Sequence, residues 1–300
     1  MNDTGRRRGA IYRVEHQMRY RHTGTVSVSH HLGCLVARRL QTQIPGPCEI
    51  RVHPAPADRI DRSDYYGNTL TYFTILTPYR ELTVETTIVV KVLMRDALIR
   101  PNRSPAWDAA PRSREMVDEQ FRFSSAYVAT SDLLAEYARP CFPAGRPLLA
   151  GAIDLMHRIH TDFKYVPGST SVMTSLTRVL SDRRGVCQDF AHVLIGCLRS
   201  LGMPARYVSG YLCTDPPPGC PRLIGADASH AWVSVRCPLH GWIDLDPTND
   251  VVPDVRHITL AWGRDYGDVA PLRGVVLGGG EHELSVAVTV VPMSAVAAAD

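Results

Sequence analysis

The segment that decides the fold runs over residues 185–192 and reads Gly-Val-Cys-Gln-Asp-Phe-Ala-His. It predicts a helix that begins at Cys187 and ends at the stop signal Gly202. Two further segments follow along the chain, Ser-His-Ala-Trp at 229–232 and Trp-Ile-Asp-Leu-Asp-Pro-Thr at 242–248. A cysteine at the start of a helix, followed by a histidine and an aspartate on successive strands, is the arrangement that a thiol nucleophile requires.

The composition is that of a folded chain. Its 300 residues are 45% hydrophobic and 21% charged, which is enough for a sizeable core, and the length allows two domains. The net charge of +3 is too small to indicate a nucleic-acid partner. The basic cluster Arg6-Arg7-Arg8 lies in a segment, 1–10, that we expect to be a disordered tail. No apolar run follows it, so the sequence predicts neither a signal peptide nor a membrane span, and we expect a cytoplasmic protein.

The cysteines do not form Cys-x-x-Cys pairs. They lie at positions 34, 48, 141, 187, 197, 213, 220 and 237. In a reducing cytoplasm we expect free thiols, with Cys197 a small buried hydrophobe in the predicted helix. A zinc site made of Cys213, Cys220, Cys237 and His240 would need ligands from strand ends about 20 Å apart. We therefore predict no metal site and no cofactor.

Residues 11–96 are predicted to form an N-terminal β-sandwich domain. Alternation with period two opens this region at 11–16 and closes it at 81–90. Between them, Asp-Tyr-Tyr-Gly-Asn at 64–68 predicts a turn whose Gly and Asn take positive φ. His30-His31 would point to opposite faces of a strand, and we expect a surface pair rather than a ligand cluster.

Two segments with different patterns lie between this domain and residue 270. Residues 97–145 contain Pro101, Pro105 and Pro111 and are expected to form a linker and a helical segment. From Pro147 the apolar period becomes 3.6, which predicts a helix that opens a catalytic core over 146–270.

Strand patterns complete the core. Three antiparallel strands are predicted at 206–212, 230–236 and 242–246, with a Pro-rich loop at Asp215–Pro221. A final strand at 283–290 is expected within a C-terminal segment, 271–300.

His230 and Asp246 are predicted to meet on neighbouring strands. In a hairpin centred on Pro238 they face each other directly, with side chains about 5 Å apart. A register slip of two residues would instead oppose His230 to Asp244. We prefer Asp246, because Pro247 ends the strand there and leaves the carboxylate at the rim of the sheet.

These residues define a catalytic hypothesis. Cys187 is the nucleophile, and the partial positive charge of a helix N-terminus favours its thiolate form. His230 is the general base and then the acid, and Asp246 fixes the tautomer of the imidazole. The backbone N–H of Cys187 is the first oxyanion donor. Three further residues are candidates for the oxyanion site or the cleft: Gln188, Tyr165 and Trp232.

The same motifs resemble the bacterial transglutaminase-like superfamily over nearly the whole chain. They match its core and flanks in order, at 64–68, 185–192, 204–211, 229–232, 241–249 and 264–269. The resemblance implies an α+β fold, with N-terminal helices packed on the antiparallel sheet of a papain-like core behind a β-sandwich, and puts Cys187, His230 and Asp246 on the triad positions. Ser234 departs from the family pattern, where glutamate usually follows His-Ala-Trp-Val. The departure leaves the triad intact and bears on substrate or rim contacts.

We therefore predict a cysteine hydrolase that cleaves amide bonds in peptides or proteins through a thioester. Water is present at about 55 M, so hydrolysis is favoured unless the cleft excludes water or holds an amine. The alternatives are a protein-glutamine amine acyltransferase and a catalytically silent binding protein; the intact triad favours an enzyme. A peptide or protein substrate is expected, with no nucleic-acid or membrane partner and no prediction of the oligomeric state.

Overall fold

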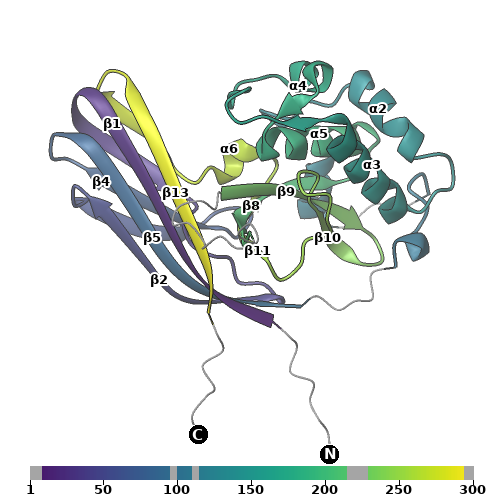
Figure 1. The fold of residues 1–300 in the computed structure, drawn as a ribbon, viewed down its shortest axis with the longest axis horizontal. Helices are drawn as coiled ribbons and strands as arrows, with labels where there is room; N and C mark the ends of the chain where they lie inside the picture. The colour runs from purple at the N-terminus through teal and green to yellow at the C-terminus, as the bar shows by residue number, and fades with distance from the viewer. Residues whose placement is uncertain (1–8, 95–99, 110–114, 215–228, 294–300) are drawn as a thin grey trace, which may run out of the picture.

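The computed structural model describes residues 9–94, 100–109, 115–214 and 229–293. Residues 1–8 of the predicted tail, the predicted loop 215–221 with Cys220, and Pro111 lie outside these ranges. Figure 1 shows long curved strands on the left and a half made of helices and a smaller sheet on the right. The predicted α+β fold, a β-rich N-terminal domain followed by a core of helices and antiparallel sheet, is confirmed.

Among the described residues, strands from both ends of the chain build the β-rich domain. They are β1 (Gly9–Gly33), β2 (Gln43–His53), β3 (Asp58–Ser63), β4 (Thr69–Ile75), β5 (Tyr79–Leu93), β12 (Arg273–Gly278) and β13 (His282–Met293). Their hydrogen bonds follow the order β2-β5-β1-β4-β3, and β12 and β13 also pair with β1. The strand predicted at 283–290 is therefore β13, and the last residues of the predicted tail 1–10 belong to β1.

Strand β1 runs through both halves of this sheet. Up to Arg21 it pairs with β5 and β13, and from Val26 it pairs with β4 and β12. The pairing with β5 shifts register between Arg21 and Val26. Apolar side chains from the two halves pack into one buried cluster that includes Val26, Phe73 and Leu82. The alternation at 81–84 comes from a face in this cluster, whereas Tyr12, Val14, Ile88 and Val90 point into the larger cluster that the core domain also fills.

The core domain combines helices with a second sheet. Its described helical segments are η1 (Pro101–Arg103), α1 (Met116–Glu119), η2 (Gln120–Arg122), α2 (Asp132–Ala138), η3 (Arg139–Cys141), α3 (Leu148–Asp162), α4 (Leu176–Asp182), α5 (Cys187–Ser200) and α6 (Tyr266–Val269). The sheet has the order β10-β9-β8-β11, with β8 (Ala205–Leu212), β9 (Ser229–Cys237), β10 (Gly241–Leu245) and β11 (His257–Gly263). No helix in the described part of the chain is long and apolar enough to cross a membrane.

Helix α5 is the centre of this domain. It packs on β8 and β9, and α2, α3 and α4 pack around it. Leu194, Cys197 and Leu198 are fully buried, as expected for a helix that is covered on nearly all sides. Burial raises the pKa of the Cys197 thiol, which keeps it protonated and inert. The helix ends before Gly202, whose φ of 80° is favourable only for glycine.

Polar contacts fix the β-rich domain to β8 and β11. His16 Nδ1 lies 2.9 Å from the hydroxyl of Tyr211, and both residues are buried. The Gln43 amide donates to Thr259 O at 2.7 Å and accepts from Thr259 N at 2.8 Å. Gln43 thereby binds the backbone of β11 in the way that a neighbouring strand would.

The predicted turn at 64–68 makes a further contact of this kind. Gly67 has the expected positive φ of 72°, but Asn68 does not adopt a positive φ, so that part of the prediction is wrong. Asn68 is buried, and its amide donates to Trp262 O at 2.8 Å and accepts from Trp262 N at 3.0 Å. Asn68 also donates to both carboxylate oxygens of Asp64 at 2.7 Å, so it closes the turn and fixes the turn to β11.

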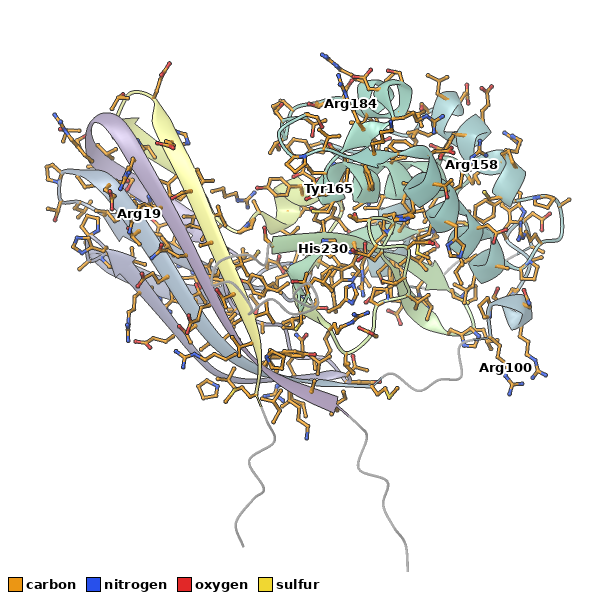
Figure 2. The ribbon with its side chains drawn as sticks, in the orientation of Figure 1. Arg19, Arg100, Arg158, Tyr165, Arg184 and His230 are labelled. Atoms are coloured by element: carbon orange, nitrogen blue, oxygen red, sulfur yellow. The ribbon has the colours of Figure 1, made fainter. Side chains whose placement is uncertain are left out.

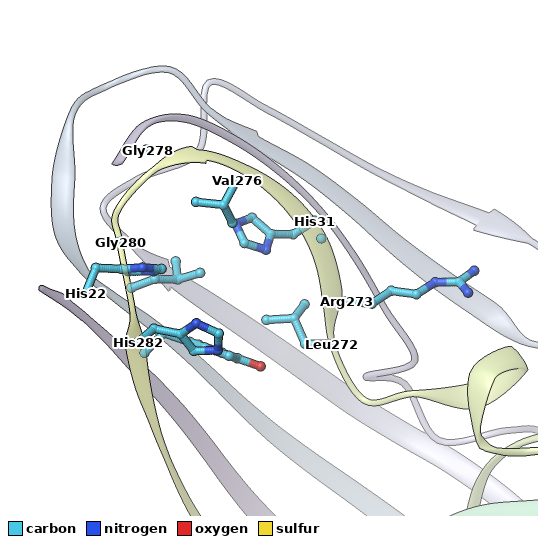
Figure 3. A pocket seen from close by; sticks show the side chains of 11 residues that line it. His22, His31, Leu272, Arg273, Val276, Gly278, Gly280 and His282 are labelled. Carbon is cyan, nitrogen blue, oxygen red and sulfur yellow. The ribbon is translucent and has the colours of Figure 1, made fainter. Parts of the chain in front are cut away.

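A cavity of about 370 Å³ lies in the β-rich domain, lined by residues of β1 on both sides of its register shift, among them His22 and His31. Figure 3 shows the rings of His22, His31 and His282 around it, with Arg273 pointing away from them. His31 is 6% exposed, so the predicted surface pair is wrong: only its neighbour His30 is exposed. The alternation of the strand was predicted correctly, but the His31 ring stacks on the buried Phe73, with centroids 4.8 Å apart, on the inner face.

Candidate active site

Local hydrogen bonds place Cys187 in the first turn of α5. The short strands β6 (Lys164–Tyr165) and β7 (Arg184–Gly185) pair in parallel and lead the chain to the helix start. The Val186 side chain has no oxygen that could cap the helix; instead, Asp189 Oδ2 accepts the Val186 N–H at 2.8 Å. A Cβ at Gly185 would lie 2.6 Å from the same oxygen, so this position requires glycine. The Cys187 side chain is partly exposed.

His230 on β9 contacts both proposed partners. Its Nε2 lies 2.7 Å from Asp246 Oδ2, which leaves Nδ1 for the Cys187 thiol, whose interaction with the imidazole contributes to the pKa of His230. Burial alone would lower the pKa of His230, but the hydrogen bonds with Asp246 and Cys187, and the charges of both, raise it to about 10. At neutral pH the site therefore favours an imidazolium beside the sulfur.

The pairing of β9 with β10 differs from the predicted register. Asp244 pairs with Ser234 and Leu245 with Val233, so the predicted alignment of His230 directly opposite Asp246 is wrong by two residues. The turn is closed by Gly241, which has a φ of 75°. A shift of two residues keeps every side chain on the same face of the sheet. Asp246 follows the last residue of β10 and reaches His230 diagonally.

The Asp246 carboxylate is fully buried and surrounded by donors. Oδ1 accepts the backbone N–H groups of Thr248 at 3.0 Å and Asn249 at 3.2 Å. Oδ2 accepts from the Asn249 amide at 2.8 Å and from His257 Nε2 at 3.1 Å, in addition to His230. Burial alone would raise the pKa of Asp246, but hydrogen bonds from His230 and His257 outweigh it and hold this pKa well below its usual range. The aspartate therefore stays ionised throughout the neutral range.

The remaining predicted site residues lie in three different environments. Tyr165 is 52% exposed on β6, and burial followed by the neighbouring Cys187 raises its pKa. Figure 2 shows Tyr165 and His230 on the side of this domain nearer to the β-rich domain in this view. Gln188 is partly exposed in the first turn of α5. Trp232 is fully buried, and its ring stacks on that of His230 with centroids 6.0 Å apart. It therefore packs against the histidine inside the protein and does not line an open cleft.

Ser234 is also fully buried, in the middle of β9. The departure from the family pattern thus lies inside the sheet, and Ser234 itself cannot contact a substrate at the rim.

Two residues of the site were not predicted from the sequence as part of it. Asn249 lies in the motif 241–249, three residues after Asp246, and that proximity is a signal that could have identified it. His257 begins β11, a strand that the sequence patterns did not predict. No local pattern links His257 to Asp246: β10 and β11 are the two edge strands of the sheet, and the segment 246–256 connects them.

The same cluster has some features of a metal site. The ligand atoms of His230, Asp246 and His257 lie within 4.8 Å of one another, and two imidazoles with one carboxylate are a donor set that zinc accepts. However, the Asn249 amide nitrogen lies 2.8 Å from Asp246 Oδ2 and 3.2 Å from His230 Nε2. This nitrogen carries N–H donors, and a cation bound among these residues would be in unfavourable contact with them. The arrangement therefore fits a hydrogen-bonded network better than a metal centre.

The zinc site considered from the sequence also lacks the necessary geometry in its described part. Cys213 directly follows β8 and Cys237 ends β9. These strands are antiparallel, with Ala205 paired to Val235, so the two cysteines lie at opposite ends of the sheet. Cys220 lies outside the described residues.

Comparison with known families gives two adjacent matches. Residues 135–247 match the transglutaminase-like superfamily, and residues 12–91 match the bacterial transglutaminase-like N-terminal region. An uncharacterized protein of Mycobacterium tuberculosis is 42% identical, and the alignment covers 94% of this chain and 92% of that protein. A Pseudomonas aeruginosa protein named protein-glutamine gamma-glutamyltransferase is 31% identical over 40% of this chain and 18% of its own length.

Among solved structures, one match covers almost the whole chain. It is the crystal structure of a Cytophaga hutchinsonii protein that was provisionally named a cysteine protease. Its TM-score is 0.76 at 22% sequence identity, and the match covers 96% of this chain and 92% of that one. At this identity the likeness establishes the fold, including the order of the β-rich domain and the core.

Proposed function

We propose that this chain, which belongs to the transglutaminase-like superfamily, is a cysteine-dependent hydrolase that cleaves amide bonds in peptides or proteins. The observation that carries the proposal is the placement of Cys187 close enough to His230 to raise its pKa, with His230 in turn hydrogen-bonded to the buried carboxylate of Asp246. The partly exposed cysteine meets a buried histidine whose pKa is raised to about 10. A purely structural His–Asp pair would have no need of a thiol beside it.

The reaction follows from these positions. The Cys187 thiolate attacks the amide carbonyl carbon, and the backbone N–H of Cys187 donates to the oxygen that becomes negative. The His230 imidazolium then gives its proton to the leaving amine as the carbon–nitrogen bond breaks, and a thioester remains. His230, now neutral, takes a proton from water as the water attacks the thioester. Collapse of that adduct releases the carboxylic acid and restores the thiolate–imidazolium pair.

Two alternatives differ in the fate of the thioester or in whether it forms. If a primary amine replaces water, the product is a new amide, as the name of the Pseudomonas aeruginosa relative describes. Water is present at about 55 M, so amine transfer requires a cleft that excludes it. A catalytically silent binding protein would need no activated thiol.

Alkylation kinetics test the activated thiol directly. The chain is treated with iodoacetamide near pH 6, where an ordinary thiol reacts slowly, and each cysteine is followed by mass spectrometry. We expect Cys187 to react at least tenfold faster than the other seven cysteines. Equal rates for Cys187 and the exposed Cys48 would refute the proposal and favour a silent binding protein.

Product analysis separates the two reactions. A glutamine-containing peptide is incubated with the protein and a primary amine, with Cys187→Ala as the control. Release of free acid in the presence of the amine supports the hydrolase, whereas amine incorporation without free acid would favour the acyltransferase.

A further inference from the structure

We propose that His257, at the start of the edge strand β11, is a positioning residue of the triad and holds the Asp246 carboxylate against His230. The proposal rests on the proposed function, because it concerns the same three residues. It adds a fourth side chain, which the resemblance to the family did not indicate.

The geometry around Asp246 gives His257 a defined role. Asp246 Oδ1 is held by two backbone N–H groups, whereas Oδ2 is shared by three side-chain donors. Two of these donors are histidines, at 2.7 Å for His230 and 3.1 Å for His257. Because His257 donates through Nε2, the carboxylate lies between two imidazoles and cannot turn toward one without leaving the other.

Packing fixes the ring that makes this contact. His257 is 5% exposed, and its ring stands at 77° to that of Trp232, with centroids 5.3 Å apart. Trp232 in turn stacks on His230, so one buried indole sets the spacing of both histidines. A side chain held in this way keeps its hydrogen bond without losing much further conformational entropy.

The charged groups around His257 are consistent with a fixed orientation. On the side away from the triad, Nδ1 lies 3.7 Å from Asp254 Oδ1, an ion-pair distance rather than a hydrogen bond. Asp254 is half exposed and also pairs with Arg256 at 3.3 Å. Asp244, on β10, lines the same small crevice as His257. His257 thus stands between the triad carboxylate and an acidic group at the surface.

The proposal predicts the direction in which the His230 pKa moves when the donor is lost. An apolar ring in place of His257 would bring a desolvating surface to Asp246 and release one side of its carboxylate. The contact with His230 would weaken, and the pKa of His230 would fall. If His257 merely competed for the oxygen, its loss would instead strengthen the His230–Asp246 contact and raise the pKa.

The experiment is an NMR titration of His230 in the full chain with labelled histidine, with the resonance assigned from His230→Gln. Titrations compare the wild type with His257→Phe, which removes the donor, and with His257→Gln, whose amide nitrogen reaches the position of Nε2. We expect His257→Phe to lower the pKa of His230 by about one unit and His257→Gln to lower it by less than half as much. A matched control is His16→Phe, which removes another buried histidine with one hydrogen-bonded nitrogen. It should leave the pKa of His230 unchanged.

Thermal unfolding of each variant is measured alongside. If His257→Phe does not fold, His257→Asn replaces it, because its shorter amide cannot reach Asp246. A His230 pKa that is unchanged or raised in the donor-free variant would overturn the positioning role. Failure of the proposed function would be seen separately, as a wild-type Cys187 that iodoacetamide does not distinguish from the other cysteines.

Discussion

Asp246 is the residue on which the site converges. Its two oxygens accept hydrogen bonds from two backbone N–H groups, one amide and two imidazoles, and its side chain is fully buried. A buried carboxylate without such partners would take up a proton, because burial disfavours the charged form. Here the donors keep it ionised, and its charge in turn supports the imidazolium of His230.

Replacing this carboxylate by an amide tests that dependence. In Asp246→Asn the charge that raises the pKa of His230 is lost while burial, which lowers it, remains. We expect the pKa of His230 to fall from about 10 to below the ordinary value of 6.5, so that the imidazolium is lost at neutral pH. Turnover should fall by about 10²- to 10⁴-fold. The NMR titration and initial rates measure the two effects, and a His230 pKa that stays near the wild-type value would contradict the role given to Asp246.

The sign of the stability effect follows from the same shift. The folded-state pKa of His230 lies above the ordinary value of 6.5, so protonation favours the folded protein. This contribution is complete below pH 6.5 and is lost as the pH rises toward about 10. Asp246→Asn should therefore flatten the dependence of unfolding free energy on pH within that window.

At the level of elements, the way helix α5 begins sets the position of Cys187, the proposed nucleophile. Val186 cannot cap the helix with its side chain, so Asp189 in the first turn takes this role by accepting the Val186 N–H and the Thr170 hydroxyl. The negative charge also complements the positive end of the helix dipole. A glycine at 185 gives the carboxylate room. The capping contacts and the cysteine thus occupy a single turn.

Removing this cap should affect both stability and reactivity. We expect Asp189→Ala to lower the free energy of unfolding by about 0.5–2 kcal/mol, because the Val186 N–H loses its acceptor. Fraying of the first turn should also slow alkylation of Cys187. Asp132→Ala is the matched control, since Asp132 is an exposed acid in the first turn of α2, where Ser131 makes the cap. The free energy of unfolding is measured in urea and the alkylation rate of Cys187 with iodoacetamide. Equal values of both quantities in the two variants would contradict this account.

The whole molecule is held together by contacts between the β-rich domain and β11. Gln43 and Asn68 each use one amide to bind a backbone N–H and a backbone C=O of this strand. The strand begins with His257, two residues before the Thr259 that Gln43 binds. The β-rich domain therefore supports the strand that supplies His257, one of the three side chains that donate to Asp246.

Loss of the Gln43 contact should weaken the molecule at this boundary. Gln43→Leu removes the side-chain oxygen that accepts the Thr259 N–H. A buried donor left without an acceptor costs about 1–3 kcal/mol. We expect a decrease of that size in the free energy of unfolding. Gln17→Leu is the control, because it removes a partly buried contact with Glu85 within the β-rich domain. An equal or larger loss in the control would argue against a special role for the interface.

The residues of the proposed triad could be singled out because local signals mark them. A glycine and an aspartate around the helix start identify Cys187, and the proline after Asp246 identifies a strand end. The face on which each strand residue lies also follows from the period of two, which a register shift of two residues preserves. The exact pairing did not follow, because the sequence does not show which residue of the turn takes positive φ.

By itself, the sequence determined the family, the α+β fold and the choice of thiol, imidazole and carboxylate, since these depend on periodicity and short motifs. Only the tertiary structure decided that Trp232 and Ser234 are buried, that β12 and β13 return to pair with β1, and that His257 reaches Asp246. The burial and the pairing depend on which strands lie side by side, and the His257–Asp246 contact depends on the segment 246–256, which connects the two edge strands of the sheet. Strand order is set by packing between segments that are far apart in the chain, and no window of sequence contains it.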